Sequence, residues 1–116
     1  MNTADLTKHA TSVLEDFKAQ DISVMDVTHL TDVTDSIIVC TATSNRHGRT
    51  LADKLQRAAK DQGIPPIGIE GEDDGQWILV DLGDIVVHIM LNEMREQYSL
   101  EKLWSVTQTT REQKSS

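Results

Sequence analysis

The chain has little of what secreted, metal-binding or membrane-spanning proteins depend on. One of its 116 residues is cysteine, so neither an intramolecular disulfide nor a multi-cysteine metal site can form. Cys40 lies in an aliphatic run, which favours a small buried side chain over a reactive thiol. No apolar run approaches the ~20 residues that span a bilayer. The N-terminus lacks the basic and apolar parts of a signal peptide, so we expect a cytoplasmic protein.

Basic residues are scarce in one part of the chain. Between Glu70 and Glu101 there are nine acidic residues and a single basic one, Arg95, so this segment carries a net charge of −8. The whole chain has the same net charge of −8, so its other charges balance. An acidic segment repels nucleic-acid phosphates and attracts a basic partner. A solvated, solubilising surface is the alternative, and charge alone does not decide between them.

Hydrophobic periodicity and turn residues predict three helices and five strands. Helices are expected from the cap Thr3 to about Gln20, from the cap Ser44 to just before Gly63, and from the cap Asn92 through Tyr98, with a further turn over Leu100 to Trp104. Strands are expected over Ile22 to Val27, Asp35 to Ala42, Ile67 to Glu70, Gln76 to Asp81, and Asp84 to Leu91. The order αββαβββα predicts a single α/β domain with a mixed sheet over residues 1–104. Residues 105–116 have no periodicity and are expected to form a mobile tail.

The last two strands are the most informative, because side chains alternate between the faces of a sheet. One set is wholly aliphatic and must face the helices: Ile78, Val80, Ile85, Val87, Ile89 and Leu91. The other set mixes aromatic, aliphatic, acidic and histidine side chains: Trp77, Leu79, Asp81, Asp84, Val86, His88 and Met90. A two-residue loop at Leu82-Gly83 would place Trp77 opposite His88 and Asp81 opposite Asp84, unless a bulge shifts this register.

The mixed set has the composition of a protein-binding surface, with an aromatic anchor, adaptable apolar contacts and charge at the edge. The alternative is that a further helix covers this face and that Trp77 is an ordinary core residue. Two facing carboxylates would be costly to bury, which disfavours that alternative. The same face could equally serve self-association as a homodimer.

Catalytic and metal-binding signals are weak. The four histidines are scattered without metal-ligand spacing, and no serine or cysteine comes with an evident base. No catalytic residue, cofactor or metal site is therefore expected. The turn from Ser44 to Arg49 begins a helix, where Arg46 and Arg49 indicate a nucleotide- or phosphate-binding enzyme as the alternative function. Two solvated arginines would give the same pattern.

The segment from Gly71 to His88 carries a recognisable motif. Its Trp77, its Asp81-Leu82-Gly83-Asp84 turn and its Val87-His88 pair resemble the signature of the ribosomal silencing factor (RsfS, Iojap-like) family. The resemblance extends over about residues 6–104. Asn92, Met94 and Gln97 depart from the residues usual in the family, so the final helix differs in sequence from the family pattern.

The resemblance implies a nucleotidyltransferase-like fold without the catalytic residues. It also implies binding to the large ribosomal subunit through ribosomal protein fourteen (uL-fourteen), with little direct nucleic-acid contact. Such binding would block association of the two subunits and repress translation during starvation. Carried over by position, and together with the composition of the mixed set, the predicted contact residues are Trp77, Leu79, Asp81, Asp84, His88, Met90 and Tyr98.

Overall fold

The computed structural model describes residues 2–30, 32 and 34–98, and its first element is helix α1 (Thr3–Asp16). The helix is capped by Asn2, whose side chain accepts a 2.8 Å hydrogen bond from the Asp5 N–H. The predicted cap, Thr3, is instead the first helical residue. The predicted end near Gln20 was also wrong. Lys18 takes a left-handed backbone conformation (φ 68°), which ends the helical path and leaves Gln20 as the first residue of a strand.

The other two helices follow the predicted signals more closely. Ser44 caps helix α2 (Asn45–Asp61), and its hydroxyl accepts a hydrogen bond from the His47 N–H. Gly63 follows this helix with φ 76°, as a residue beyond a helix end often does. Helix α3 (Asn92–Tyr98) includes Asn92 as its first residue. The further turn predicted after residue 99 and the predicted tail over 105–116 lie outside the described residues.

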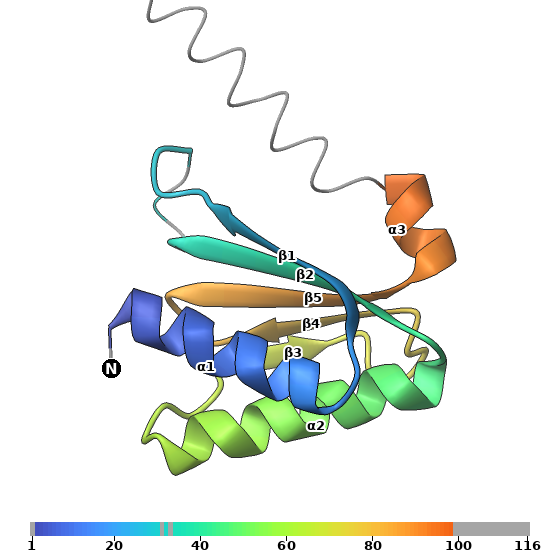
Figure 1. Ribbon diagram of the computed structural model, residues 1–116, viewed down its shortest axis with the longest axis horizontal. Coiled ribbons are helices and arrows are strands. Elements are labelled where there is room, and N and C mark those ends of the chain that lie inside the picture. The colour runs from blue at the N-terminus through green and yellow to red at the C-terminus, as the bar shows by residue number, and fades with distance from the viewer. Residues whose placement is uncertain (1, 31, 33, 99–116) are drawn as a thin grey trace, which may run out of the picture.

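Five strands form one mixed sheet in the order β1-β2-β5-β4-β3. The strands are β1 (Gln20–Asp26), β2 (Ser36–Ala42), β3 (Gly68–Glu70), β4 (Trp77–Asp81) and β5 (Ile85–Leu91). β2 and β5 pair in parallel at the centre, and the other neighbours are antiparallel. The predicted element order and mixed sheet are confirmed. Figure 1 shows α1 and α2 beneath the sheet and α3 at the end of β5.

The β4–β5 hairpin has a different register from the predicted one. Trp77 pairs with Met90, Leu79 with His88, and Asp81 with Val86. The Leu82 N–H donates to the Ile85 carbonyl, so the loop is Gly83-Asp84 instead of Leu82-Gly83. Gly83 has φ 88°, and the first loop position of such a hairpin favours a glycine for this reason. Trp77 is therefore not opposite His88, and Asp81 is not opposite Asp84.

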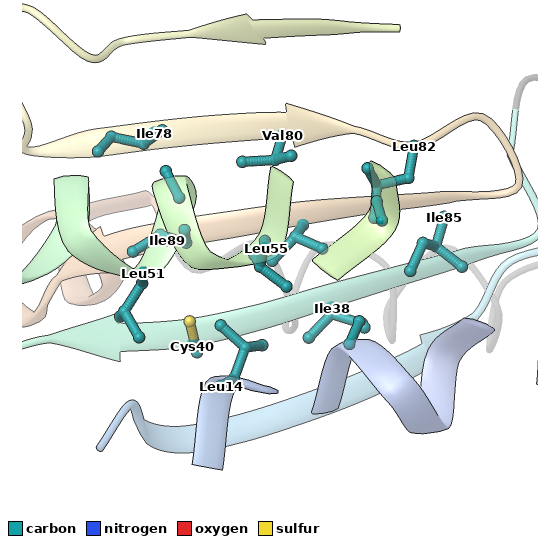
Figure 2. Packing of buried hydrophobic residues seen from close by; sticks show 14 of the residues in the cluster. Leu14, Ile38, Cys40, Leu51, Leu55, Ile78, Val80, Leu82, Ile85 and Ile89 are labelled. Carbon is teal, nitrogen blue, oxygen red and sulfur yellow. The ribbon is translucent and has the colours of Figure 1, made fainter. Parts of the chain in front are cut away.

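The sheet face toward α1 and α2 forms the main core (Figure 2). Leu14 from α1 and Leu51 and Leu55 from α2 pack on aliphatic residues of the strands. The aliphatic set predicted to face the helices does so: Ile78, Val80, Ile85, Val87 and Ile89 are buried in this core, and Leu91 packs against it. Cys40 is fully buried here, and burial raises the pKa of its thiol to about 12. This confirms the interpretation of Cys40 as a buried hydrophobe.

The opposite face of the sheet carries a smaller buried cluster. It consists of Val27, Ile37, Val39 and Met90, and the partly buried Met25, Leu30, Trp77 and Met94 pack around it. Met94 belongs to α3, which contacts β5 and β2 and so covers part of this face. Among residues 2–30, 32 and 34–98, the face is thus neither sealed by a full helix layer nor left bare.

Candidate protein-binding face

The mixed set of side chains lies on the sheet face away from α1 and α2. We call the surface formed there by β4, β5 and the end of α3 the hairpin face, and it consists of Trp77, Leu79, Asp81, Val86, His88 and Tyr98. All but Tyr98 are half-buried, and Tyr98 is 48% exposed. The structure therefore brings together most of the predicted contact residues on a single surface.

Trp77 is held in place by two aromatic neighbours. Its indole Nε1–H donates to Nδ1 of His88 at 3.0 Å, and the two ring centroids are 5.9 Å apart. On α3, the Tyr98 ring lies 4.9 Å from the Trp77 ring, measured between centroids, at an angle of 49°. A tilted arrangement at this distance is favourable for aromatic pairs. The indole thus has a fixed orientation before any partner arrives.

The hydrogen bond from Trp77 also defines the state of His88. Because Nδ1 accepts a hydrogen bond, it carries no proton itself, so the ring is neutral and its proton is on Nε2. Burial lowers the pKa of His88 from the ordinary 6.5 to about 4, which agrees with a neutral ring near pH 7. The histidine is consequently an uncharged support for Trp77 at neutral pH.

The two aspartates of the turn have separate roles. Asp81 is half-buried, and its carboxylate accepts a hydrogen bond from the Gly83 N–H at 2.9 Å. Asp84 has an exposed side chain at the tip of the turn, while its main-chain carbonyl accepts bonds from the N–H groups of Asp35 and Ser36. The two carboxylates do not face each other across the hairpin, so the argument from their burial does not apply.

Met90 differs from the other predicted contact residues because it is fully buried. It pairs with Trp77 across the hairpin and belongs to the small cluster beneath it. Met90 thus belongs to the cluster on which Trp77 packs, and it offers no surface of its own to a partner. Its role in contact with a partner stays a prediction that this geometry does not favour.

Helix α3 is attached to the sheet by Arg95. Its Nη1 donates to the main-chain carbonyl of Asp21 and, at 2.9 Å, to the Thr41 hydroxyl. Asp21 has φ 47° and lies where the pairing of β1 with β2 is irregular. The guanidinium thus joins α3, the helix that carries Tyr98, to β1 and β2. The sequence marked Arg95 only as the lone base of the acidic segment, and its structural role was missed.

The acidic turn before β4, residues 72–74, is hydrogen-bonded to side chains of helix α2. The Arg49 guanidinium donates to the carbonyls of Glu72 and Asp73, both at 2.8 Å. The Asn45 side-chain amide donates to the carbonyl of Asp74. Three successive carbonyls are therefore bonded toward the protein. This role of Arg49 was also missed, because nothing in the sequence relates residue 49 to residues 72 and 73.

The turn from Ser44 to Arg49 is mostly engaged in internal contacts. Ser44 caps α2, and Arg49 points to the acidic turn. His47 accepts from the Thr43 N–H through Nδ1, and its Nε2 lies 2.8 Å from the Phe17 carbonyl. A shallow hollow of about 430 Å³ remains beside these residues, with Lys18 and Arg46 as its basic lining. Of the two arginines in the predicted anion site, only Arg46 is left to face a ligand.

Two further site classes can be compared with the described residues. Within 2–30, 32 and 34–98, no group of three or more His, Cys, Asp and Glu side chains is placed to hold a metal ion. None of the helices in this part of the chain combines the length and hydropathy of a bilayer-spanning segment.

Comparison with known proteins identifies relatives of this chain. The sequence model of the family described as "Ribosomal silencing factor during starvation" matches residues 1–116. A Chromobacterium violaceum protein named ribosomal silencing factor RsfS is 41% identical over 104 residues, covering 90% of this chain and 85% of that relative. A mouse protein, mitochondrial assembly of ribosomal large subunit protein 1, is 38% identical over 98 residues, covering 82% of this chain and 43% of that protein.

A solved structure gives the same result for the fold. The crystal structure of a Chromobacterium violaceum protein, 41% identical, superimposes with a TM-score of 0.88 and covers 90% of this chain and 88% of its own. Fold and sequence thus define a small α/β protein whose relatives include named silencing factors. The chain belongs to the ribosomal silencing factor family. The implied likeness to nucleotidyltransferases stays a prediction.

Proposed function

We propose that this protein represses translation by binding the large ribosomal subunit and preventing its association with the small subunit. The contact is made through the hairpin face and ribosomal protein fourteen (uL-fourteen). Binding alone suffices, because a protein on the face where the subunits meet excludes the second subunit sterically. No catalytic turnover is involved.

The fixed indole on the hairpin face is the observation that carries this proposal. A half-buried tryptophan, held by His88 and Tyr98 and lying outside the main core, is typical of an interface anchor. Asp81 belongs to this face, and the segment from Glu70 to Glu101 carries a net charge of −8, so the surface suits a basic protein and repels phosphate. A ribosomal protein with a basic surface fits this face better than bare RNA does.

Family membership supports the ribosome as the partner, and one relative supports the large subunit in particular. The mouse relative is named for assembly of the mitochondrial ribosomal large subunit. We extend this to the present chain and expect an interface of ordinary size, about 1,200–2,000 Å² in total.

Sedimentation with purified ribosomal subunits tests the proposal directly. The protein should travel with isolated large subunits, not with small ones, and should reduce the amount of joined particles in proportion to its concentration. Trp77→Ala should lose both effects. Lys8→Ala, a change on the exposed side of α1, is the matched control and should retain them. Sedimentation with neither subunit would contradict the proposal.

The alternative of a nucleotide- or phosphate-binding enzyme keeps one supporting feature, the hollow beside Lys18 and Arg46. The engagement of Ser44 and Arg49 in internal hydrogen bonds makes it less favourable. Calorimetry with nucleotides and Mg²⁺ separates the two functions. Heat of binding that disappears in Arg46→Ala would support the alternative, and its absence with every nucleotide would remove it.

A further inference from the structure

A second feature of the hairpin face is a small hollow at the edge of the sheet. It has a volume of about 260 Å³ and is lined by Glu70, Gly71, Trp77 and Leu79. Glu70 on β3 pairs with Leu79 on β4, and Leu79 pairs with His88 on β5. Residues that pair directly across strands share one face of a sheet, so these three side chains form a row beside the indole.

The wall of the hollow is open where a ligand would enter. Among the described strands, β3 pairs only with β4 and forms an edge of the sheet. Gly71 follows β3 with φ 87°, and a Cβ at this residue would lie 2.0 Å from the main-chain oxygen of Trp77. Only glycine permits this approach, so residue 71 contributes main chain alone to the lining. Nothing larger than a hydrogen atom projects from it.

The remaining lining offers three kinds of contact. The indole N–H of Trp77 is already bonded to His88, which leaves the aromatic surface for a ligand. Leu79 supplies an apolar floor and is half-buried. The Glu70 carboxylate is exposed, and among the described residues it forms no hydrogen bond or ion pair. An aromatic surface, an aliphatic floor and an unpaired carboxylate together match a long aliphatic side chain that ends in a cation.

We propose that this hollow receives a basic side chain of the ribosomal partner, arginine in preference to lysine. This inference rests on the proposed function for the identity of the partner. A guanidinium stacks on an indole and binds a carboxylate with two parallel hydrogen bonds, which an ammonium group cannot do. The Glu70 carboxylate in the lining, within a segment of net charge −8, disfavours an anionic group there.

Paired charge-removing variants test the subsite. Glu70→Gln keeps the shape of the side chain and removes its charge, and Glu72→Gln removes the same charge from the neighbouring turn, outside the hollow. Glu70→Gln should weaken binding to large subunits about three- to tenfold, as expected for a contact with a cation on an aromatic surface. Glu72→Gln should change it less than about twofold, because it alters only the general field. If Glu70→Gln and Glu72→Gln weakened binding to large subunits equally, the proposed subsite would be contradicted.

The outcomes separate the subsite from the proposed function. If Trp77→Ala abolishes binding and Glu70→Gln has no effect beyond that of Glu72→Gln, the function stands and the subsite fails. If the unmodified protein does not bind large subunits, the function fails, and the hollow is judged by nuclear magnetic resonance instead. In a Trp104→Phe background, which assigns the Trp77 signal, N-acetyl-arginine amide should shift the indole N–H resonance.

The neutral isostere N-acetyl-citrulline amide is the control in that titration and should shift the signal much less. The response to the arginine compound should disappear in Glu70→Gln. Equal shifts with both compounds, or no shift with either, would overturn the assignment of the hollow to a basic side chain.

Discussion

The two faces of the sheet are built from the same strands but serve different ends. The face toward α1 and α2 is sealed by leucine and alanine side chains, and its core residues are 5% exposed or less. The opposite face has a four-residue buried cluster surrounded by methionines, an aromatic pair and a histidine. Within the part of the chain that the structure describes, α3 covers only part of it. Neighbouring residues of one strand, Ile38 and Val39 or Ile78 and Leu79, thus enter quite different environments.

This difference teaches how a small domain can keep its stabilising core apart from a surface such as the proposed binding face. Area buried on the helical side stabilises the fold, roughly 25 cal/mol for each Å² removed from water. The hairpin face can then hold groups that are poor core residues, such as Asp81 and His88. A strand needs no extra length for this, because alternate side chains already point to opposite faces.

Truncating one residue on each face is the most direct test of the difference between the two faces. Ile38→Ala should lower the free energy of unfolding by about 3–5 kcal/mol, because it leaves a cavity in the main core. Trp77→Ala should cost less stability and instead weaken binding to large subunits by about 2–4 kcal/mol. Urea denaturation and sedimentation measure the two quantities. If the folded Ile38→Ala protein lost binding as Trp77→Ala does, the separation of the faces would not hold.

The pH dependence of stability tests a feature of the hairpin face, the buried and neutral His88. The pKa of His88 is about 4 in the folded protein and 6.5 ordinarily, so the unfolded chain binds more protons between these values. The free energy of unfolding should therefore fall as the pH is lowered from 6.5 to 4, by up to about 3 kcal/mol from this group.

His88→Asn is the comparison variant for that measurement, because its side-chain oxygen can still accept from the Trp77 N–H. The difference between the two proteins in urea denaturation at several pH values isolates His88 from the carboxylates that titrate in the same range. Parallel pH profiles would show that burial of His88 does not depress its pKa as described.

A smaller effect is expected where α3 meets the sheet. Arg95→Met removes the donor to Asp21 and Thr41 and should cost about 1–2 kcal/mol, since the buried Thr41 hydroxyl loses a charged partner. Amide hydrogen exchange in α3 should become faster, while exchange in β2 and β5 stays slow. Arg95→Lys keeps one charged donor, so its free energy of unfolding should lie between those of the unmodified protein and Arg95→Met. Unchanged exchange in α3 would mean that Arg95 does not hold the helix.

Much of the fold could be predicted from the sequence because local patterns decide it. The alternation from Trp77 to Leu91 separates the two faces correctly, and Ser44 caps α2 as expected. The end of α1 was misjudged because the chain leaves the helix at Lys18, a residue that rarely takes a positive φ and gives no stop signal. The predicted hairpin register was wrong because the loop was placed at Leu82-Gly83 instead of Gly83-Asp84, and Gly83 fits either loop position.

The site was less predictable, because its geometry depends on contacts between distant segments. Trp77 and His88 meet as diagonal neighbours of the hairpin, which the predicted register placed directly opposite. Arg95 joins α3, the helix that carries Tyr98, to β1 and β2, some 74 and 54 residues away in sequence. No local pattern encodes such contacts, and Tyr98 was predicted only through the family resemblance.

The hydrogen bonds from Arg49 and Asn45 to the acidic turn have a consequence for the kinetics of association. Because three successive carbonyls are already bonded, the turn has little backbone freedom left to lose when a partner docks. Its carboxylates are carried by a backbone that is already ordered, so the turn should bind as a preformed surface with little rearrangement. Association should then be limited mainly by diffusion and electrostatic steering, and salt should slow it far more than it hastens dissociation.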